Sequence, residues 1–530
     1  MNVLSPLNIL LLASFLSMLL LSMALLILCG CQGTHSGNVL VFPGEYSHWL
    51  NMRVILEELV VRNHSVTVLV CSASPTVNYT KPEGFSFKVY NVPFERHDLE
   101  SLQEDFLNFW IYEAQNASMW QVGLKIREVL GSMTALQLSM CDAIFHNKEL
   151  MDTLRQWEFD AVLSDPMMPC GDLMADALDV PLIVSLRFTF GMAMERHCGQ
   201  IPAPPSFVPR VHNFVTYMIH SSFFSIHCLQ NMDKYYSGIK GRPTTLCEIM
   251  GKADIWLIRT NWDFEYPRPF LPNFKFVGGL HCKPAKPLSK AMEEFVQSSG
   301  DDGIVVFSLG SMIKNLTKER GNTIATALGQ IPQKVLWRYS GEKPETLAPN
   351  TRVYEWIPQN DLLGHPKTKA FVTHGGTNGL YESIYHGVPM VGIPLFADQP
   401  DNIMHMKNKG AAVMVDFNKM TSKDLVDGLN SVINDPSYKA SMMRLSRIHH
   451  DQPMKPLDTA VFWIEFVMRN KGAKHLRVEA HNLSWYQYHC LDVAAALLTI
   501  VALVIVVSIK TCIFCFRKCC KKTKSRQKTE

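Results

Sequence analysis

The chain has 530 residues, which is too long for one ordinary hydrophobic core, so two or more domains are expected. Hydrophobic residues make up 47% of it, as is typical of a folded protein. The formal net charge of only +3 argues against a general nucleic-acid binder, and we expect no nucleic-acid partner.

The N-terminus has the pattern of a secretory signal peptide. Ile9–Leu28 is nearly continuous apolar sequence, and the small residues Gly30 and Gly33 follow it. We therefore interpret residues 1–33 as a cleaved signal. A retained membrane anchor is the alternative, because no strongly basic stretch precedes the apolar run.

Residues 34–285 read as alternating strands and helices, the pattern of a parallel, doubly wound sheet. A polar loop, Gly44–His48, is expected after the first strand, and a helix after that loop. A short helix is expected near Gly171–Leu178. We expect the last strand to close this half, and the predicted strands are Asn38–Phe42, Ser65–Cys71, Asp160–Ser164, Pro181–Ser185 and Asp254–Arg259.

Residues 286–445 repeat this pattern after a proline- and lysine-rich linker at Lys283–Leu288. Thr421 is expected to cap a helix that runs to Asn434. The fold class predicted is therefore α/β, with two Rossmann-like domains. Neither half opens with the glycine fingerprint of dinucleotide-binding proteins, and no P-loop motif is present. The strands expected here are Gly303–Phe307, Lys334–Arg338, Ala370–Thr373, Met390–Pro394 and Ala412–Asp416.

The C-terminal part has the pattern of a membrane anchor. We expect residues 446–490 to form helices that pack back on the protein, followed by a membrane-proximal segment. A transmembrane helix is predicted at residues 491–509, because Val493–Ile509 carries no charge. The tail Lys510–Glu530 holds eight Lys or Arg residues and one acid, which predicts a cytosolic tail at 510–530 and places the bulk of the chain in a secretory-pathway lumen or outside the cell.

Sequons and cysteines are compatible with the secretory pathway. Five Asn-x-Ser/Thr sequons occur, at Asn63, Asn78, Asn116, Asn315 and Asn482. The cysteines outside the signal and tail are scattered, so they do not form a disulfide scaffold. The tail cysteines imitate a zinc pattern, but acylated or inert cysteines fit the membrane edge better.

A ligand site is predicted in Trp356–Asn402. His374–Gly379 follows a buried strand and opens a helix, so free backbone N–H groups and a positive helix end meet there. Its glycines would let phosphates approach the backbone. Glu382 stands two helical turns later, where its carboxylate can accept hydrogen bonds from a ribose diol, and Trp356 offers a flat face to a base. A His-Gly-Gly turn alone would equally fit a tight strand–helix joint, but three such elements at strand ends favour a site.

This segment resembles the donor-binding signature of UDP-glycosyltransferases. The resemblance covers essentially the whole chain and is closest to the microsomal UDP-glucuronosyltransferases of vertebrates, in their second family. The stretches Glu45–Trp49, Val277–Lys286, Trp356–Pro366 and Phe462–Met468 carry it. It implies a GT-B fold, with the acceptor bound by the N-terminal domain and the UDP-sugar by the C-terminal one.

The resemblance also implies roles for individual residues. Trp356 would stack on uracil, while Gln359 and Glu382 would hold the uridine. Asp398 and Gln399 would hold sugar hydroxyls, with a helix-capping acid as the alternative for Asp398. Arg338 falls in the family's donor pocket. The residues expected around the diphosphate are Ser308, Ser311, Thr373, His374, Gly376 and Asn378.

Catalytic residues follow from the same resemblance. His48 matches the family's general base and Asp165 the carboxylate that orients it, although a bland loop histidine and a capping acid would also fit those positions. Arg259 is expected near the glucuronate carboxylate, with an interdomain salt bridge as the alternative. We expect one in-line displacement that inverts the anomeric carbon, with no metal and no cofactor beyond the co-substrate UDP-glucuronate.

The expected product is the β-D-glucuronide of a small lipophilic acceptor, formed in the endoplasmic reticulum by a single-pass type I membrane protein that associates with itself or with related enzymes. Phe106–Trp120 and Pro202–Tyr236 are expected to line the acceptor site. Three alternatives stay open: an enzyme that uses another UDP-hexose, a silent lipophile-binding or regulatory subunit, and a dinucleotide oxidoreductase, which the missing glycine fingerprint disfavours.

Overall fold

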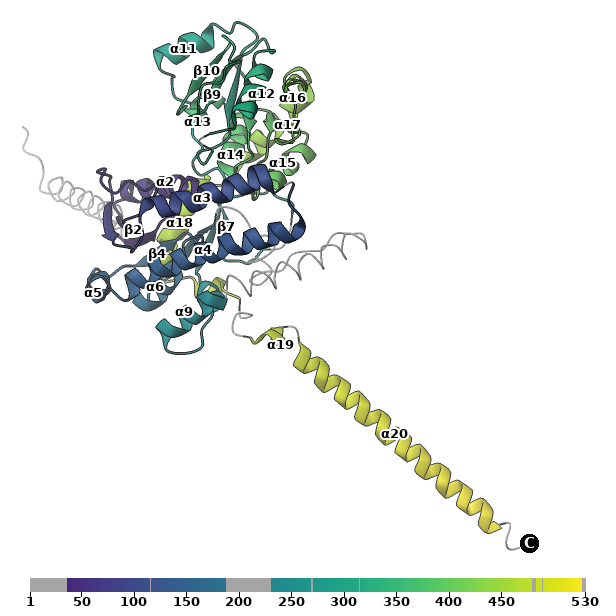
Figure 1. Ribbon diagram of the computed structural model, residues 1–530. Helices are drawn as coiled ribbons and strands as arrows, with labels where there is room; N and C mark the ends of the chain where they lie inside the picture. Colours follow the sequence, from purple (N-terminus) through teal and green to yellow (C-terminus); the bar gives the residue numbers. More distant parts are fainter. Residues whose placement is uncertain are drawn as a thin grey trace, which may run out of the picture. The chain divides into compact units, whose positions relative to one another are not determined.

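The computed structural model describes residues 36–526 apart from 115, 187–229, 268–269, 314, 479–482 and 489. The predicted signal peptide at 1–33, the sequon Asn482 and most of the predicted acceptor-lining segment Pro202–Tyr236 lie outside these residues. The chain divides into two units, Met1–Leu476 and Arg477–Glu530. The first holds two parallel sheets with their helices (Figure 1).

The N-terminal sheet has the strand order β3-β2-β1-β4-β5-β6-β7, and its described neighbours are all parallel. The predicted strands are confirmed to within a residue or two. The expectation that Asp254–Arg259 closes this half is wrong, because β7 follows it. The strands are β1 (Asn38–Phe42), β2 (Ser65–Cys71), β3 (Ser86–Tyr90), β4 (Ala161–Ser164), β5 (Leu182–Leu186), β6 (Ile255–Ile258) and β7 (Phe274–Phe276).

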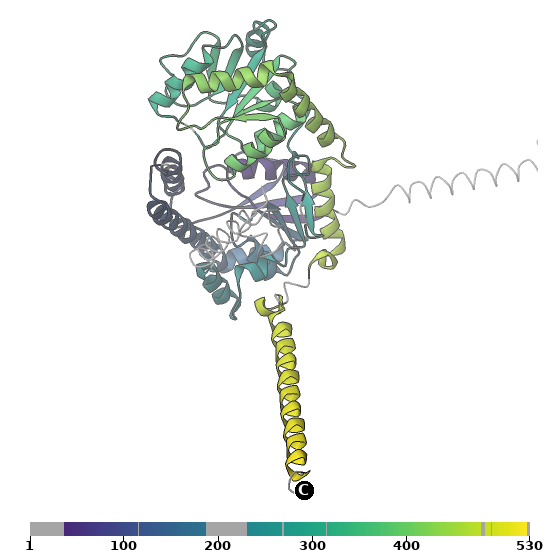
Figure 2. The same ribbon diagram turned by 90° about the vertical axis from the view of Figure 1, so that its right-hand side faces the viewer.

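Alternate residues of β1 face two different cores, because side chains of a strand point to opposite faces. Leu40 and Phe42 pack with the helices α4, α5, α6, α9 and α10, while Val39 and Val41 pack with α2 and with a late helix, α18 (Pro456–Asn470). Figure 2 shows α18 against this sheet. The other helices are α2 (Ser47–Val61), α3 (Arg96–Asn108), the π-helical turn η1 (Phe109–Glu113), α4 (Met119–Phe145), α5 (Lys148–Gln156), α6 (Gly171–Leu178), α9 (Gln230–Lys240) and α10 (Leu246–Met250).

The C-terminal sheet repeats the arrangement with the order β10-β9-β8-β11-β12-β13, again parallel throughout. Val305 and Phe307 face one core, and Ile304 and Val306 face the other. Thr421 makes the predicted capping box at the start of α16. The strands are β8 (Ile304–Ser308), β9 (Lys334–Arg338), β10 (Thr351–Tyr354), β11 (Thr368–Thr373), β12 (Met390–Gly392) and β13 (Ala412–Met414).

Helices cover both faces of this second sheet. The linker Lys283–Leu288 has no regular secondary structure, as expected. The expected domain end at 445 falls inside α17, so the helix continues past it. These helices are α11 (Lys290–Gln297), α12 (Lys318–Leu328), α13 (Gln359–Leu363), α14 (Thr377–His386), α15 (Gln399–Asn408), α16 (Ser422–Asn434) and α17 (Pro436–His450). The short turn η3 (Lys474–Leu476) instead packs with the N-terminal core through Leu476.

One part of the N-terminal half packs against the second core. Leu107 and Ile111, from α3 and η1, are buried with β8 and β9 side chains, and the ring of Tyr112 lies 6.2 Å from that of Phe417. The start of the Phe106–Trp120 segment therefore joins the two halves, and the expected role of this segment in lining an acceptor site stays a prediction. Within the N-terminal half, a disulfide joins Cys141 to Cys170.

The second unit contains a short helix, α19 (Trp485–Tyr488), and the long helix α20 (Leu491–Arg526). Leu491–Lys518 is long and apolar enough to cross a membrane, which confirms the expected C-terminal span as a helix. Within the first unit, the sequon residues Asn63, Asn78, Asn116 and Asn315 are all exposed.

Candidate active site

His48 and Asp165 meet at the point where the strand order of the N-terminal sheet reverses. Doubly wound sheets bind ligands there, beyond the carboxyl ends of the strands. Asp165 directly follows β4, whose Ser164 pairs with Phe42 at the end of β1. The Nδ1 atom of His48 lies 2.6 Å from Oδ2 of Asp165, and the side chains are 15% and 0% exposed. His48 stands in the first turn of α2, so the expected loop ends two residues earlier than predicted, at Tyr46.

The loop before His48 is held in a strained shape. Tyr46 has a positive φ of 54°, which is uncommon for a residue other than glycine. The Glu45 carboxylate accepts hydrogen bonds from Ser74 Oγ at 2.7 Å and from the hydroxyl and N–H of Thr76. A Cβ on Gly44 would lie 2.6 Å from His48 Cβ, so only glycine fits there. No role for Glu45 was predicted from the sequence, although Glu45 stands close to the predicted base, His48, in the chain.

Arg259 follows β6 and lies beside this pair. Its Nη2 is 3.5 Å from Asp165 Oδ2, its Nη1 donates to the His48 carbonyl at 3.4 Å, and it is only 3% exposed. Burial alone would raise the pKa of Asp165, but attraction to His48, their hydrogen bond and Arg259 together hold that pKa below its usual value. Arg259 does not line the donor cleft described next, so the structure places it at the pair instead of in that cleft.

A cleft encloses about 1500 Å³, including its open mouth, at the strand-order reversal of the second sheet. Ser308 ends β8 and pairs with Thr373 at the end of β11. Sequence reasoning missed Ser47, His281 and Lys283, which also line the cleft; Ser47 brings it next to His48. The predicted donor residues that line it are Ser308, Ser311, Arg338, Trp356, Gln359, Thr373, His374, Gly376, Asn378, Glu382 and Gln399.

The two ends of this cleft differ in chemistry. Gln359 Nε2 donates to Glu382 Oε2 at 2.5 Å. Burial raises the pKa of Glu382 to about 7, and the hydrogen bond from Gln359 only partly opposes this. The guanidinium of Arg338 lies 5.2 Å from the ring centre of Trp356, whose side chain is 64% exposed. The end of the cleft near Trp356 therefore offers an aromatic ring that Arg338 packs against, and the Glu382 carboxylate as a hydrogen-bond acceptor.

The turn before α14 combines packing needs with an open helix end. Gly375 has a φ of +88°, and a Cβ there would lie 2.7 Å from Ile403, so the tight joint itself requires glycine. Gly376 lines the cleft at the N-cap of α14, and because glycine has no side chain, it does not cap the N–H groups at the start of this helix. Asn378 and Gly379 of the first turn also line the cleft, and the N–H groups of a first helical turn suit an anion.

Asp398 lies at the edge of this arrangement and does not line the cleft. It stands at the N-cap of α15 without a capping hydrogen bond from its side chain, and it accepts from Asn402 Nδ2 at 2.7 Å. Gln399 does line the cleft, and its Oε1 accepts from the N–H groups of Leu395 and Phe396 at 2.9 and 3.2 Å. Both side chains are thus fixed by neighbouring backbone and amide groups.

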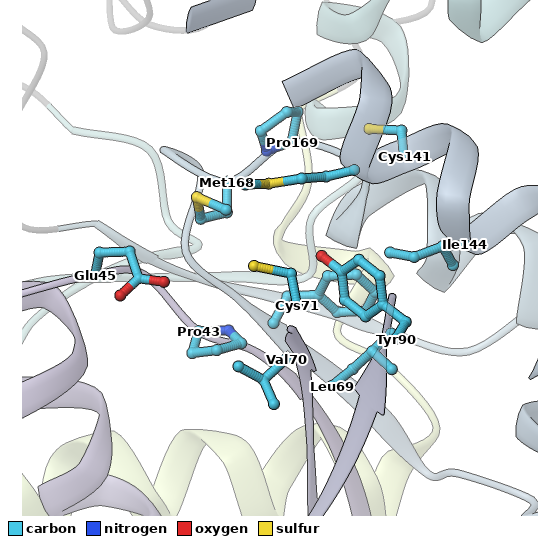
Figure 3. Close-up of a pocket in the computed structure, with 12 residues that line it drawn as sticks. Pro43, Glu45, Leu69, Val70, Cys71, Tyr90, Cys141, Ile144, Met168 and Pro169 are labelled. Atoms are coloured by element: carbon cyan, nitrogen blue, oxygen red, sulfur yellow. The ribbon is translucent and has the colours of Figure 1, made fainter. Parts of the chain in front are cut away.

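A smaller, mostly apolar pocket lies at the ends of β1 and β2 (Figure 3). Glu45 stands at one end of it, and Tyr90 and Ile144 at the other. The disulfide partner Cys141 and the loop residue Met168 complete its wall. Among the residues that the structure describes, no group of three or more His, Cys, Asp or Glu side chains is placed to hold a metal ion.

Taken together, two parallel doubly wound domains, each with polar residues at its strand-order reversal, define a GT-B glycosyltransferase. Solved structures agree with this class. The spinosyn forosaminyltransferase SpnP matches 82% of this chain and all of its own with a TM-score of 0.59, at 18% identity. The glycotransferase of kitacinnamycin matches with a TM-score of 0.57, also at 18% identity, over 82% of this chain and 98% of its own. At such identities the likeness concerns the fold alone, and it confirms the fold predicted.

Sequence comparison identifies the family. The model described as "UDP-glucoronosyl and UDP-glucosyl transferase" matches residues 37–526. UDP-glucuronosyltransferase 2A1 of Rattus norvegicus is 56% identical over 507 residues, covering 93% of this chain and 96% of the relative. UDP-glucuronosyltransferase 2B15 of Homo sapiens is 56% identical over 514 residues, covering 94% and 97%. The chain therefore belongs to the UDP-glucuronosyl and UDP-glucosyl transferase family and is an enzyme, which confirms the resemblance recognised in the sequence.

Proposed function

We propose that this protein transfers glucuronic acid from UDP-glucuronate to a hydroxyl or similar nucleophile of a small lipophilic acceptor. The observation that carries this proposal is the His48–Asp165 pair, with an Nδ1–Oδ2 distance of 2.6 Å, next to a cleft that gathers the donor residues expected from the family. The names of relatives at 56% identity support glucuronate as the sugar.

The pair suits a general base. With Asp165 on Nδ1, the neutral ring would carry its proton there, and Nε2 would be the nitrogen that takes a proton from the acceptor. The lowered pKa of Asp165 keeps it ionised, so it can stabilise the imidazolium that forms. The acceptor oxygen then attacks the anomeric carbon, UDP leaves from the opposite face, and an α-linked donor gives a β-linked product.

Donor residues have distinct proposed roles. Uracil would stack on Trp356, and the ribose diol would donate to Glu382, which Gln359 steadies. The leaving diphosphate would be met by the helix end before Asn378, and this charge stabilisation needs no metal in our proposal. Gln399 and, at the edge, Asp398 would bind sugar hydroxyls. The other residues proposed around the diphosphate are Ser308, Ser311, Thr373, His374 and Gly376.

For the sugar carboxylate, Arg338 and Lys283 are the cations that line the cleft. Arg259 instead lies 3.5 Å from Asp165. We therefore propose that Arg259 orients the catalytic pair. Recognition of the carboxylate is then left to a residue of the cleft.

The acceptor would enter beside His48 and use the apolar pocket of Figure 3 as part of its wall. The Glu45 carboxylate is already occupied by Ser74 and Thr76, so the wall offers an incoming molecule mainly apolar contact. This favours lipophilic acceptors. The apolar span Leu491–Lys518 and the basic tail support a single-pass type I orientation, with the catalytic part in the lumen of the endoplasmic reticulum.

A sugar panel tests the proposal. Membranes that contain the full chain are incubated with a simple phenol and, in turn, UDP-glucuronate, UDP-glucose, UDP-galactose or UDP-N-acetylglucosamine. We expect product with UDP-glucuronate and none above the His48→Ala background with the others. Product with another sugar would support the alternative of a different UDP-hexose, which the family description also includes. No product with any sugar and acceptor would favour a silent subunit.

A further inference from the structure

Asn378, in the first turn of α14, is held from the other half of the protein at two points. Its side-chain Oδ1 accepts a hydrogen bond from Asn51 Nδ2 at 2.7 Å. Its backbone carbonyl lies 3.1 Å from His281 Nε2. Burial lowers the pKa of His281 to about 4, so a neutral ring donates this bond at physiological pH. Asn378 also lines the donor cleft, so its position matters for any ligand there.

Asn51 is itself fixed in one orientation. It is 2% exposed and lies on α2, three residues after His48. Its Nδ2 group donates to the Ser47 carbonyl at 2.9 Å as well as to Asn378. An amide nitrogen has two hydrogens, and both are used by these acceptors. Asn51 therefore donates a hydrogen bond to Asn378, and Asn378 must accept it with its side-chain oxygen.

The hydrogen bond from Asn51 determines which atoms of the Asn378 side chain can face a ligand. A carboxamide has its oxygen and its NH2 group on opposite branches, so the branch not facing Asn51 carries the NH2 group. Without a fixed partner the amide could rotate and bring its oxygen towards the cleft. An oxygen there would repel a diphosphate, whereas an NH2 group would donate to it.

We propose that Asn51 is a positioning residue for the donor: it sets the Asn378 amide so that the NH2 group faces the diphosphate. This inference rests on the proposed function, in which Asn378 contacts that diphosphate. Because Asn51 and His48 share α2, the same contact ties the helix of the base to the donor cradle. Asn51 acts through Asn378 and touches neither the sugar nor the acceptor.

The test uses full-length protein in membranes and measures the dissociation constant of radiolabelled UDP, together with KM for UDP-glucuronate and for the acceptor. The variants are N51D, N51A, the milder N51S, N378A and the double variant N51A/N378A. We expect UDP binding to weaken about tenfold in N51A and N378A, the loss of about one charge-assisted hydrogen bond. N51D should weaken it more, because a carboxylate makes the Asn378 amide turn its oxygen towards the cleft. KM for the acceptor should stay unchanged.

Non-additivity separates positioning from a merely structural role. If Asn51 acts through Asn378, the double variant binds UDP no more weakly than N378A. A double variant in which both losses add would overturn the inference, and so would normal UDP binding in N51S and N51D while N378A is weakened. Normal UDP binding in N378A would instead overturn the donor site itself. N51S keeps a small polar side chain, so the comparison can still be made if N51A or N51D fails to fold.

Discussion

The Nδ1 atom of His48 lies 2.6 Å from Oδ2 of Asp165, although 117 residues separate them in the chain. The contact forms because β1 and β4 are adjacent and parallel, so the residues that follow them meet at one edge of the sheet. Asp165 is fully buried and its pKa is held below its usual value, and in our proposal it determines which ring nitrogen of His48 carries the proton.

Replacing Asp165 by Asn should therefore lower kcat about 10³- to 10⁴-fold, since the amide favours the wrong tautomer of His48. UDP affinity should be unchanged, because the donor cleft does not include Asp165. Initial rates and equilibrium UDP binding on the same membranes check this. Asp301→Asn, an exposed position, serves as the matched control. A variant with kcat within tenfold of the parent would refute the orienting role.

Two roles of Arg259, orienting the catalytic pair and binding the glucuronate carboxylate, can be distinguished by substitution. If it orients the pair, Arg259→Lys and Arg259→Gln should lower kcat by about tenfold or more while the preference for UDP-glucuronate over UDP-glucose remains. If it reads the glucuronate carboxylate, that preference should collapse. Competition between the two labelled donors measures the ratio directly. Its distance of 3.5 Å from Asp165 leads us to expect the first result.

The raised pKa of Glu382 predicts a pH-dependent donor affinity. Burial lifts this pKa from 4.5 to about 7, so the carboxyl becomes protonated as the pH falls through 7. If the ionised form accepts from the ribose, UDP affinity should fall about tenfold per pH unit below this value. Glu382→Gln should bind UDP weakly at every pH and show a flat profile. A parental affinity that does not change between pH 8 and pH 5.5 would contradict the assignment.

Gly44 should be irreplaceable for a steric reason. A Cβ there would lie 2.6 Å from His48 Cβ and 2.8 Å from Asp165 Oδ2. Gly44→Ala should therefore abolish turnover and destabilise the fold by about 1–3 kcal/mol. Gly131→Ala is the matched control: it lies in helix α4 with nothing within 4 Å of the new Cβ, so stability should stay equal or rise slightly. Thermal unfolding and initial rates compare the two.

The periodicity of the sequence predicts much of this fold. Asn38–Phe42, Ser65–Cys71 and Lys334–Arg338 are buried strands with the expected bounds, because short apolar runs between turn residues indicate parallel strands. The strands β3, β7 and β10 escaped prediction, and β7 shows one reason. It has only three residues, and their alternating Phe-Lys-Phe pattern is too short to distinguish a strand from a loop.

The candidate site was predictable only where a local motif carries the chemistry. Residues near Trp356–Asn402 are close in sequence, so their gathering in one cleft could be anticipated. The location of Arg259 could not, because β4 and β5 lie between β1 and β6 in the sheet, and the long Arg259 side chain reaches His48 across the ends of these strands. Nor could the contact of Asn51 with Asn378, which spans 327 residues and depends on how the two halves meet. Spacing along the chain has no information about such long-range contacts.

The central claim is that His48 removes the acceptor proton. The most direct measurement compares His48→Gln with the parent for glucuronide formation and for UDP binding, with the exposed His146→Gln as control. We predict that His48→Gln loses about 10³-fold or more in turnover while its UDP affinity stays within about twofold of the parent. Turnover within tenfold of the parent, with UDP binding intact, would contradict the account.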